Sequence, residues 1–350
     1  MKTFQAISPG KGAYIDEPVP VPGKEDVLVR VCYCGVCGTD YSLFSGNSSF
    51  VREKQADYPM RLGHEWSGIV CATGPSVTKV KVGDHVVGDN YVSCGVCPAC
   101  QKGDYNGCTQ RHHVGTINPR WPGAFAEYYM APERHIYKLS PNVSLKQAAL
   151  CEPLSVAYGG IKKMNIRSDS VVAVIGTGSI GMAAAALAKY RGAGRVYMIG
   201  RNQVKLDKAM ALEISGTIHS GLLDPEKEIF RLTGGHGADF VLECSGAPEA
   251  MAQALNVSAQ NATIAAIGFY EKKLPYFDID RLVSKQLHLI GIMGEYGNLE
   301  AVANIMAEVD LKLESIITRT MHFETDMNKA LAPDDPHSVI KTMVYFGGDS

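Results

Sequence analysis

The stretch that decides the fold is residues 170–181, which read SVVAVIGTGSIG. Its first six residues form an almost wholly apolar run, as in strands that are buried on both faces of a parallel sheet. Gly176, Gly178 and Gly181 follow in the spacing G-x-G-x-x-G, and residues 182–189 are rich in alanine and helical in propensity. A glycine loop between a buried strand and a helix is typical of a doubly wound fold that binds phosphates.

The glycine loop has the features of a pyrophosphate site. Gly176 would make the turn, Gly178 would let a pyrophosphate approach the backbone, and Gly181 would let the helix pack on the strand. Ser179 and Ile180 begin the helix, where free N–H groups face the phosphates. The alternative is a tight turn with a purely structural role.

The end of the next strand, at residues 195–199, indicates which dinucleotide would bind. Sites for NAD place an acid about 20 residues after the loop, where it accepts a bond from the ribose 2′-hydroxyl. Here Gly200, Arg201 and Asn202 follow the strand, and no acid is present. Glycine leaves room for a 2′-phosphate, Arg201 supplies a forked cation, and Lys205 adds a second charge. These residues predict NADP in preference to NAD, the alternative being that Arg201 is a solvated surface residue.

The pattern of expected secondary structure changes at about residue 155. Before that point, short strands are punctuated by glycine and proline, as in an all-β barrel or sandwich. After it, strands alternate with helices, which indicates a parallel sheet covered on both faces. Strands are expected at residues 27–31, 68–72, 83–87, 240–244, 263–268 and 287–292, and a late helix at residues 299–308.

Four cysteines lie close together in the first half: Cys94, Cys97, Cys100 and Cys108. Their spacing, C-x2-C-x2-C-x7-C, lets one loop close around a tetrahedral metal. Zinc takes such thiolates at about 2.3 Å. Disulfides are the alternative, although nothing else in the chain indicates secretion. The spacing predicts a closed structural zinc site.

A second group of ligand types is dispersed through the chain. Cys37 and His64 come from separate loops, with Glu65 beside the histidine and Glu152 at the junction of the two halves. A thiolate, an imidazole and nearby carboxylates suit a zinc that keeps one position open. Each residue alone is better explained as a buried cysteine or a satisfied histidine.

Together these segments resemble the zinc-dependent medium-chain dehydrogenase/reductase family over essentially the whole chain. Within it, EPLSVA at 152–157 is most similar to the junction of the polyol (sorbitol-type) dehydrogenases. The other matching segments are GVCGTD at 35–40, LGHEWSG at 62–68, VKVGDHV at 80–86, the cysteine lobe, GAFAEYY at 123–129 and GTGSIG at 176–181.

The resemblance implies an α/β fold with two domains and an active site in the cleft. A GroES-like β-barrel catalytic domain would span residues 1–155 and be completed by residues 294–350. A Rossmann domain, with a doubly wound parallel sheet, would span residues 156–293. Relatives pair their Rossmann sheets edge to edge, which implies a homodimer or homotetramer.

For the metal sites, the resemblance implies two zinc ions per chain, one structural and one catalytic. Cys37 and His64 would bind the catalytic zinc, and Glu65 would join them. Glu152 would be a ligand or would bond to the metal-bound water. Asp40 would orient His64.

The proton path departs from the family pattern. Thr39 matches the hydroxyl that takes the substrate proton, but Ser42 stands where many relatives carry histidine. Leu43 replaces the tyrosine of sorbitol-type enzymes, and the substrate-contacting arginine expected near residues 291–295 is absent. The relay would then run through Ser42, the cofactor ribose or water, and sorbitol itself is a poor choice of substrate.

The expected function is reversible oxidation of a secondary hydroxyl on a polyol, cyclitol or sugar derivative. A phosphorylated substrate would use Arg52, Lys54 and Arg120, whose alternative role is that of ordinary solvated charges. Trp121, Phe44 and Tyr296 are candidate pocket walls, the alternative being that they are core aromatics. The other functions considered are a threonine-dehydrogenase-like amino alcohol dehydrogenase, a zinc alcohol or aldehyde reductase, and a non-catalytic protein with the cysteine lobe as a zinc ribbon.

Composition sets outer limits on partners and location. The 350 residues are 46% hydrophobic and 20% charged, with a net charge of -2, which gives no reason to expect a nucleic-acid or anionic-membrane partner. No signal-peptide pattern and no membrane-spanning run are visible. Ten cysteines without an export signal predict reduced thiols in the cytoplasm.

Overall fold

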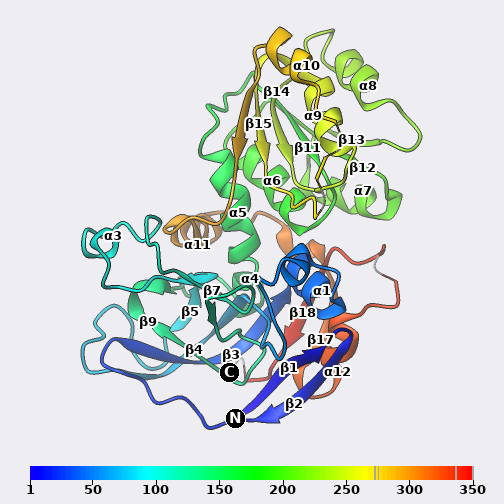
Figure 1. The fold of residues 1–350 in the computed structure, drawn as a ribbon. Coiled ribbons are helices and arrows are strands. Elements are labelled where there is room, and N and C mark those ends of the chain that lie inside the picture. Colours follow the sequence, from blue (N-terminus) through cyan, green and yellow to red (C-terminus); the bar gives the residue numbers. More distant parts are fainter. Residues whose placement is uncertain (272, 275, 336, 349–350) are drawn as a thin grey trace. The chain divides into compact units, whose positions relative to one another are not determined.

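The structure is a computed structural model that describes residues 1–271, 273–274, 276–335 and 337–348. The chain forms two compact units. Unit 1 comprises Met1–Glu152, Glu295–Val309 and Ile317–Ser350, and unit 2 comprises Pro153–Gly294 and Asp310–Ile316. In Figure 1, unit 2 carries the green and yellow part of the chain, while both ends of the colour scale belong to unit 1.

Unit 1 is built mainly from strands. They are β1 (Lys2–Ser8), β2 (Lys11–Asp16), β3 (Asp26–Val36), β4 (Glu65–Thr73), β5 (His85–Gly88), β6 (Tyr91–Val92), β7 (His112–Val114), β8 (Arg120–Trp121), β9 (Tyr128–Pro132), β10 (Ile136–Lys138), β17 (Ile317–His322) and β18 (Lys341–Tyr345). The largest sheet has the order β10-β5-β4-β3-β18-β17, and β9 also pairs with β3. The long strand β3 is therefore central, because β4, β9 and β18 all pair with it.

The helices of unit 1 are short and lie between these strands. They are α1 (Gly38–Ser45), α2 (Ser49–Arg52), α3 (Pro98–Gln101), η1 (Glu133–His135), α4 (Leu145–Ala148), α11 (Asn298–Glu308) and α12 (Phe323–Leu331). The core of unit 1 contains the rings of Trp66 and Tyr129, which contact at a tilt of 43° with centroids 4.6 Å apart. Phe4 and Phe125 are buried in the same cluster.

Unit 2 contains one six-stranded parallel sheet in the order β13-β12-β11-β14-β15-β16. The order reverses next to β11, so the chain runs outward in both directions from that strand. The strands are β11 (Val171–Ile175), β12 (Arg195–Gly200), β13 (Gly216–His219), β14 (Ala238–Glu243), β15 (Ser258–Ala266) and β16 (His288–Gly291). The helical segments are α5 (Cys151–Ile161), which enters from unit 1, α6 (Ser179–Tyr190), α7 (Gln203–Ala209), η2 (Met210–Leu212), α8 (Pro225–Leu232), α9 (Ala250–Val257), α10 (Ile279–Ser284) and η3 (Leu313–Ile316).

The predicted division is confirmed: unit 2 has the doubly wound parallel sheet, and unit 1 is built mainly from short strands. All five residues of β11 are buried, as the apolar run 171–175 predicts. The late helix predicted at residues 299–308 is α11. The strands that were not predicted individually are β1, β2, β6, β7, β8, β9, β10, β13, β17 and β18.

The glycine loop shows why two of its positions require glycine. Gly176 has φ +112°, a conformation that side chains disfavour. A Cβ on Gly181 would lie 2.0 Å from the carbonyl oxygen of Gly176, so only glycine lets α6 start this close to the strand. A Cβ on Gly178 would meet no atom within 4 Å. The loop is therefore packed on one side and open at its middle glycine.

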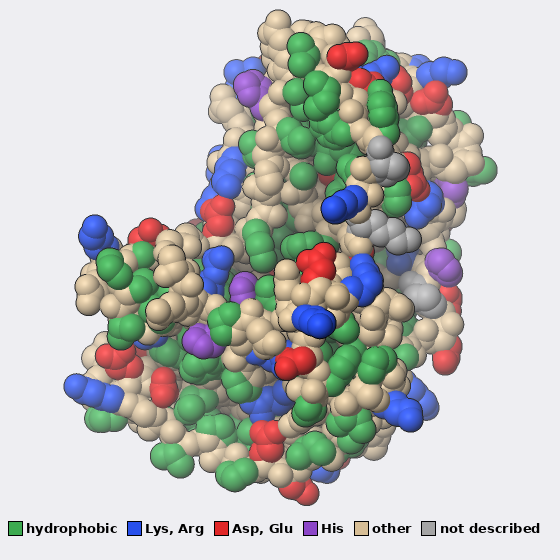
Figure 2. Space-filling view, in the orientation of Figure 1, with side chains coloured by type: hydrophobic (Ala, Val, Ile, Leu, Met, Phe, Trp, Pro, Cys, Tyr) green, Lys and Arg blue, Asp and Glu red, His purple; other side chains and the backbone are tan. Residues whose placement is uncertain are grey.

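Charge is distributed without strong segregation on the face shown in Figure 2, where acidic and basic side chains are interspersed. This agrees with the net charge of -2. Among the residues that the structure describes, no helix combines the length and the apolar character that crossing a membrane requires.

The two glycines give a stability prediction. Gly181→Ala is expected to lower the free energy of unfolding by about 1–3 kcal/mol, because the new methyl group overpacks against rigid backbone. Gly178→Ala is the matched control and should change it by less than about 0.5 kcal/mol. Urea unfolding followed by circular dichroism measures both. Equal stability of the two variants would show that the close approach at Gly181 does not matter.

Candidate functional site

The four predicted lobe cysteines come together in unit 1 around α3. Their ligand atoms all lie within 4.8 Å of one another. The sulfur atoms are 3.9 Å apart for Cys94 and Cys100, 3.5 Å for Cys97 and Cys100, and 3.6 Å for Cys108 and Cys94. A disulfide would need about 2.05 Å, so these cysteines are free thiols.

The lobe geometry suits a tetrahedral metal. Four sulfurs at about 2.3 Å from a central zinc lie about 3.8 Å apart, close to the observed separations. Backbone N–H groups of Cys94 and Cys97 donate to the sulfurs of Cys108 and Cys94 at 3.4 Å each. Backbone donors, first at Val96 and then at Cys97, lower the pKa of Cys94 to about 6, which favours the thiolate that binds metal. The donor set therefore fits zinc.

A buried polar chain that sequence reasoning missed anchors the first lobe cysteine. His135 Nδ1 lies 2.8 Å from Asp89 Oδ2, and His135 Nε2 accepts from the backbone N–H of Ser93 at 2.9 Å. Tyr137 also donates to Asp89. Because Ser93 directly precedes Cys94, these hydrogen bonds fix the point at which the lobe leaves the sheet.

The second metal-ligand group consists of Cys37, His64 and Glu65, whose ligand atoms also lie within 4.8 Å of one another. Sheet register explains how residues so far apart in sequence meet. Cys37 follows the end of β3, Glu65 begins β4, and Gly35 on β3 pairs directly with Glu65. A Cβ on Gly35 would lie 2.1 Å from Glu65 Oε2, so the carboxylate lies across the glycine. The donor set of one sulfur, one imidazole and one carboxylate suits zinc with an open position.

Asp40 acts on the backbone beside two of these ligands. It is fully buried and accepts from the backbone N–H of Cys37 at 2.9 Å and of Gly63 at 3.2 Å. Its nearer oxygen lies 3.7 Å from His64 Nδ1, beyond hydrogen-bond reach. Burial raises the pKa of Asp40, an effect opposed by the charge of His64. In this geometry Asp40 fixes the segments that carry Cys37 and His64, whereas the prediction had it bonded to the imidazole.

The most unexpected group at this site is Lys341, on β18. Its side chain is only 1% exposed, and its ammonium lies 2.7 and 2.5 Å from the two oxygens of Glu65. It also donates to the carbonyl oxygen of Val36 at 3.0 Å. Burial favours the neutral amine, but the charge of Glu65 raises the pKa of Lys341 above its usual value. The only signal in the sequence is a single lysine between apolar residues in VIKTMV.

Glu152 is buried near this group but is not part of it. One of its oxygens accepts from Asn90 Nδ2 at 2.5 Å. Burial raises the pKa of Glu152 to about 7, the His64 charge opposes the shift, and the Glu65 charge adds to it. A carboxyl group with this pKa can hold or release a proton near neutral pH.

Two predicted proton-relay residues lie on α1 directly after Cys37. Thr39 is half-buried, and the hydroxyl of Ser42 donates to the Thr39 carbonyl oxygen at 3.1 Å. The Ser42 proton is thus directed at the helix backbone. Leu43 is completely buried.

Two of the three cations suggested for a substrate phosphate are engaged elsewhere. Arg120 donates to Thr116 and to Asp57, and Arg52 donates to the carbonyl oxygen of Asn47. Lys54 has φ +58°, and the structure gives it no role. These contacts do not favour a phosphorylated substrate.

The suggested wall aromatics are partly explained by packing. Phe44 is only 2% exposed and belongs to the core. The Trp121 indole donates to the Met130 carbonyl oxygen at 2.8 Å. Tyr296 stacks edge-on against Tyr105 with 4.7 Å between centroids.

In unit 2 the glycine loop lies at the carboxyl end of β11, and Arg201 follows the neighbouring strand β12. Arg201 is exposed and forms an ion pair with Glu249 at 2.8 Å. Asn202 caps α7 by accepting from the backbone N–H of Lys205 at 3.1 Å. The side chain of Asn202 therefore has a structural task of its own.

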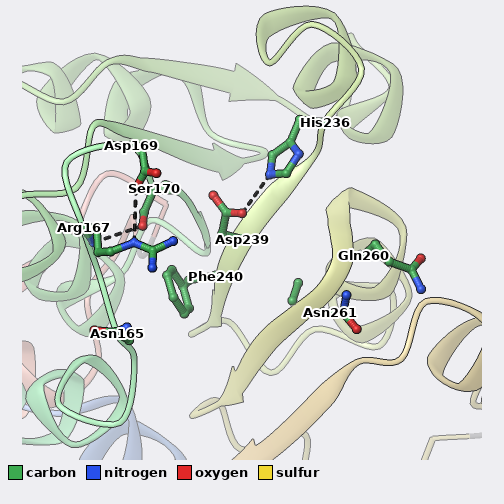
Figure 3. A pocket seen from close by; sticks show the side chains of 10 residues that line it. Asn165, Arg167, Asp169, Ser170, His236, Asp239, Phe240, Gln260 and Asn261 are labelled. Atoms are coloured by element: carbon green, nitrogen blue, oxygen red, sulfur yellow. Dashed lines mark hydrogen bonds and ion pairs between the residues drawn. The ribbon is translucent and has the colours of Figure 1, made fainter.

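A cavity of about 400 Å³ lies at the amino-terminal ends of strands in the same sheet, next to the starts of β11 and β14 (Figure 3). Its charged side chains are paired with each other: Arg167 with Asp169 at 3.4 Å and His236 with Asp239 at 2.8 Å. Ligand-binding crevices of such sheets lie at the carboxyl ends of strands. We therefore assign no role to this cavity.

Comparison with known proteins agrees with these geometries. Residues 23–141 match the model of the alcohol dehydrogenase GroES-like domain, and residues 179–308 match that of the zinc-binding dehydrogenases. The chain is 32% identical over 324 residues to a sorbitol dehydrogenase of Halalkalibacterium halodurans, covering 91% of this chain and 92% of that relative. It is also 32% identical over 316 residues to an L-threonine 3-dehydrogenase of Bacillus velezensis, covering 89% and 90%.

Among solved structures, one assigned as a zinc-binding dehydrogenase of Sinorhizobium meliloti, bound to NADP, matches with a TM-score of 0.86. It is 26% identical, and the match covers 99% of each chain. The predicted family resemblance is confirmed. The chain belongs to the zinc-dependent alcohol dehydrogenases of the medium-chain dehydrogenase/reductase family, with a polyol-dehydrogenase-like sequence.

Proposed function

We propose that this enzyme reversibly transfers hydride between NADP(H) and a secondary alcohol of a polyol, cyclitol or sugar derivative. The observation that carries the proposal is the group of half-buried Cys37 with buried His64 and Glu65, beside Glu152. A relative with this chain's overall sequence pattern is named sorbitol dehydrogenase. Zinc, when bound, would serve as a Lewis acid toward the reacting oxygen.

The chain's own residues have separable tasks in this proposal. Cys37, His64 and Glu65 would hold the catalytic zinc. Asp40 holds the backbone at Cys37 and at the residue before His64. Glu152, buried beside these ligands and held by Asn90, would complete the zinc's ligand set or bond to its water ligand. Thr39, two residues after Cys37, would take the substrate proton.

The two units would divide the work. Unit 1 would act as the catalytic domain and carry the structural zinc on Cys94, Cys97, Cys100 and Cys108. Unit 2 would bind the cofactor, with the open face of Gly178 admitting the pyrophosphate and the start of α6 donating N–H groups to it. This assigns residues 1–152, 295–309 and 317–350 to catalysis and residues 153–294 and 310–316 to cofactor binding. The sequence predicts the division at 1–155 with 294–350 against 156–293, so residues 310–316 are the main difference.

The preference for NADP rests on the end of β12. An acid is missing at Gly200, and Arg201 supplies a planar cation suited to phosphate. A solved structure 26% identical to this chain is bound to NADP. Lys205 lies one helical turn further and would add positive charge.

We also propose that the enzyme is a homo-oligomer. The outer edge of β16 has no neighbouring strand among the described residues, and Leu289 on it is 40% exposed. On α10, Ile279 and Val283 are 57% and 64% exposed. A second copy pairing at this edge would cover apolar surface and unpaired backbone groups.

All ten cysteines are free thiols, which supports the proposed cytoplasmic location.

The second candidate is an amino alcohol dehydrogenase, because L-threonine 3-dehydrogenases match this chain at the same identity as the sorbitol dehydrogenase. The zinc-loaded enzyme should be tested with polyols, cyclitols, sugars, their phosphates and L-threonine, with NADP and NAD in parallel, by the absorbance of the reduced nicotinamide. We expect turnover of a polyol-type substrate with NADP. Turnover of L-threonine alone would establish the second candidate, and silence across the panel would overturn both.

Arg201→Ala is expected to weaken NADP binding by about 1–3 kcal/mol, as for a charge-assisted contact, and to leave NAD almost unchanged. Isothermal titration with each oxidised cofactor measures this. Arg231→Ala, at another exposed, ion-paired arginine of unit 2, is the matched control. Equal losses for NADP and NAD would contradict a phosphate contact at Arg201.

Cys100→Ser is expected to release the lobe zinc and to lower the free energy of unfolding. The loss should be a sizeable part of the about 10–16 kcal/mol that structural zinc binding supplies in small zinc domains. Metal content and thermal unfolding are the readouts, and Cys71→Ser, at an exposed cysteine outside both groups, is the control. A Cys100→Ser protein with less zinc but unchanged stability would argue against a structural role.

A further inference from the structure

The ion pair between Arg201 and Glu249 joins two segments that are far apart in the chain. Arg201 Nη1 lies 2.8 Å from Glu249 Oε1. Arg201 directly follows β12, whereas Glu249 lies between β14 and α9. The two side chains are 71% and 46% exposed, so solvent and a ligand can reach both.

The glycine loop lies between these two segments. In the sheet, β11 is flanked by β12 on one side and β14 on the other. A Cβ on Gly200 would lie 2.5 Å from the Thr177 side chain, and one on Gly176 would lie 3.0 Å from Ser245. The last residue of β12 and Ser245, just after β14, therefore both adjoin the loop. The ion pair connects the segments that follow these two strands, across the carboxyl end of β11.

We propose that Glu249 is a specificity-determining residue that competes with the 2′-phosphate of NADP for Arg201. The proposal rests on the proposed function, in which Arg201 receives that phosphate. A phosphate monoester carries about -1.5 to -2 charges at neutral pH, whereas Glu249 carries one negative charge. The phosphate therefore binds the Arg201 guanidinium and either displaces the Glu249 carboxylate from it or shares the guanidinium with that carboxylate. Glu249 thereby lowers the affinity for NADP but not for NAD.

The competition has a bounded size. An exposed ion pair contributes little, because water and salt screen it. Breaking such a pair corresponds to about twofold to fivefold in a dissociation constant. Arginine has five N–H donors, and the ion pair with Glu249 uses Nη1. The remaining donors let the phosphate and Glu249 contact Arg201 at the same time. The effect of Glu249 on the dissociation constant of NADP therefore stays within about twofold to fivefold.

Another role for Glu249 would give the opposite result. If its carboxylate accepts a bond from the 2′-hydroxyl of NAD, then neutralising it weakens NAD and leaves NADP unaffected. Glu249 would in that case replace the acid that is missing after β12. The two roles are distinguished by which cofactor responds.

The test uses the full-length, zinc-loaded enzyme without substrate. Dissociation constants of NADP, NAD, adenosine 2′,5′-bisphosphate and AMP are measured by isothermal titration for Glu249→Gln, Arg201→Ala and the double variant. Glu226→Gln is the matched control, since Glu226 forms an exposed ion pair with Arg281 at 3.1 Å in the same unit. The control should change none of the four constants.

We expect Glu249→Gln to bind NADP and adenosine 2′,5′-bisphosphate about twofold to fivefold more tightly, with NAD and AMP unchanged. The gain should vanish in the Arg201→Ala background. No gain for NADP, or a gain that persists without Arg201, would overturn the competition and leave the proposed NADP preference standing. Weaker NAD binding would overturn the competition and give Glu249 the contact to the 2′-hydroxyl of NAD instead. An Arg201→Ala variant that binds NADP normally would instead overturn the proposed phosphate contact itself, and the competition with it.

Discussion

The buried ion pair between Lys341 and Glu65 is the interaction on which the candidate metal centre depends. Both side chains are about 1% exposed, and a charge so buried is tolerated only with a close partner. Removing one member of such a pair typically destabilises a protein by about 3–5 kcal/mol, because the other charge is left unpaired. Lys341 also bonds to Val36 at the end of β3, so the pair fixes both the carboxylate and the strand that leads to Cys37.

Three buried carboxylates lie around this centre, and each has its own partner. Asp40 accepts from backbone N–H groups, Glu65 is held by Lys341, and Glu152 accepts from Asn90. Without these partners the three would repel one another or take up protons. The arrangement holds both Glu65 oxygens on Lys341, while burial raises the pKa of Glu152 to about 7. The same kinds of side chain therefore have different chemistry within one site.

The features that could be predicted from the sequence are those written within a short segment. The cysteine lobe and the glycine loop each lie within fifteen residues, so their spacing states their geometry. Lys341 and Glu65 are 276 residues apart, and a single lysine in a strand does not say which acid it meets. The pairing of Arg201 with Glu249, 48 residues apart, depends on the strand order of unit 2. Strands such as β13, with four residues, are too short to show a period.

The place of β18 in unit 1 has a consequence for biosynthesis. This strand lies between β3 and β17 in the sheet, although it is formed by residues 341–345. A chain emerging from the ribosome, amino end first, would release all of the unit 2 sheet before Lys341. Until then Cys37, His64 and Glu65 would be present without the Lys341 ammonium that holds the Glu65 carboxylate. Maturation of the metal centre would then be a post-translational event, set by the arrival of the last strand and not by the synthesis of the ligands.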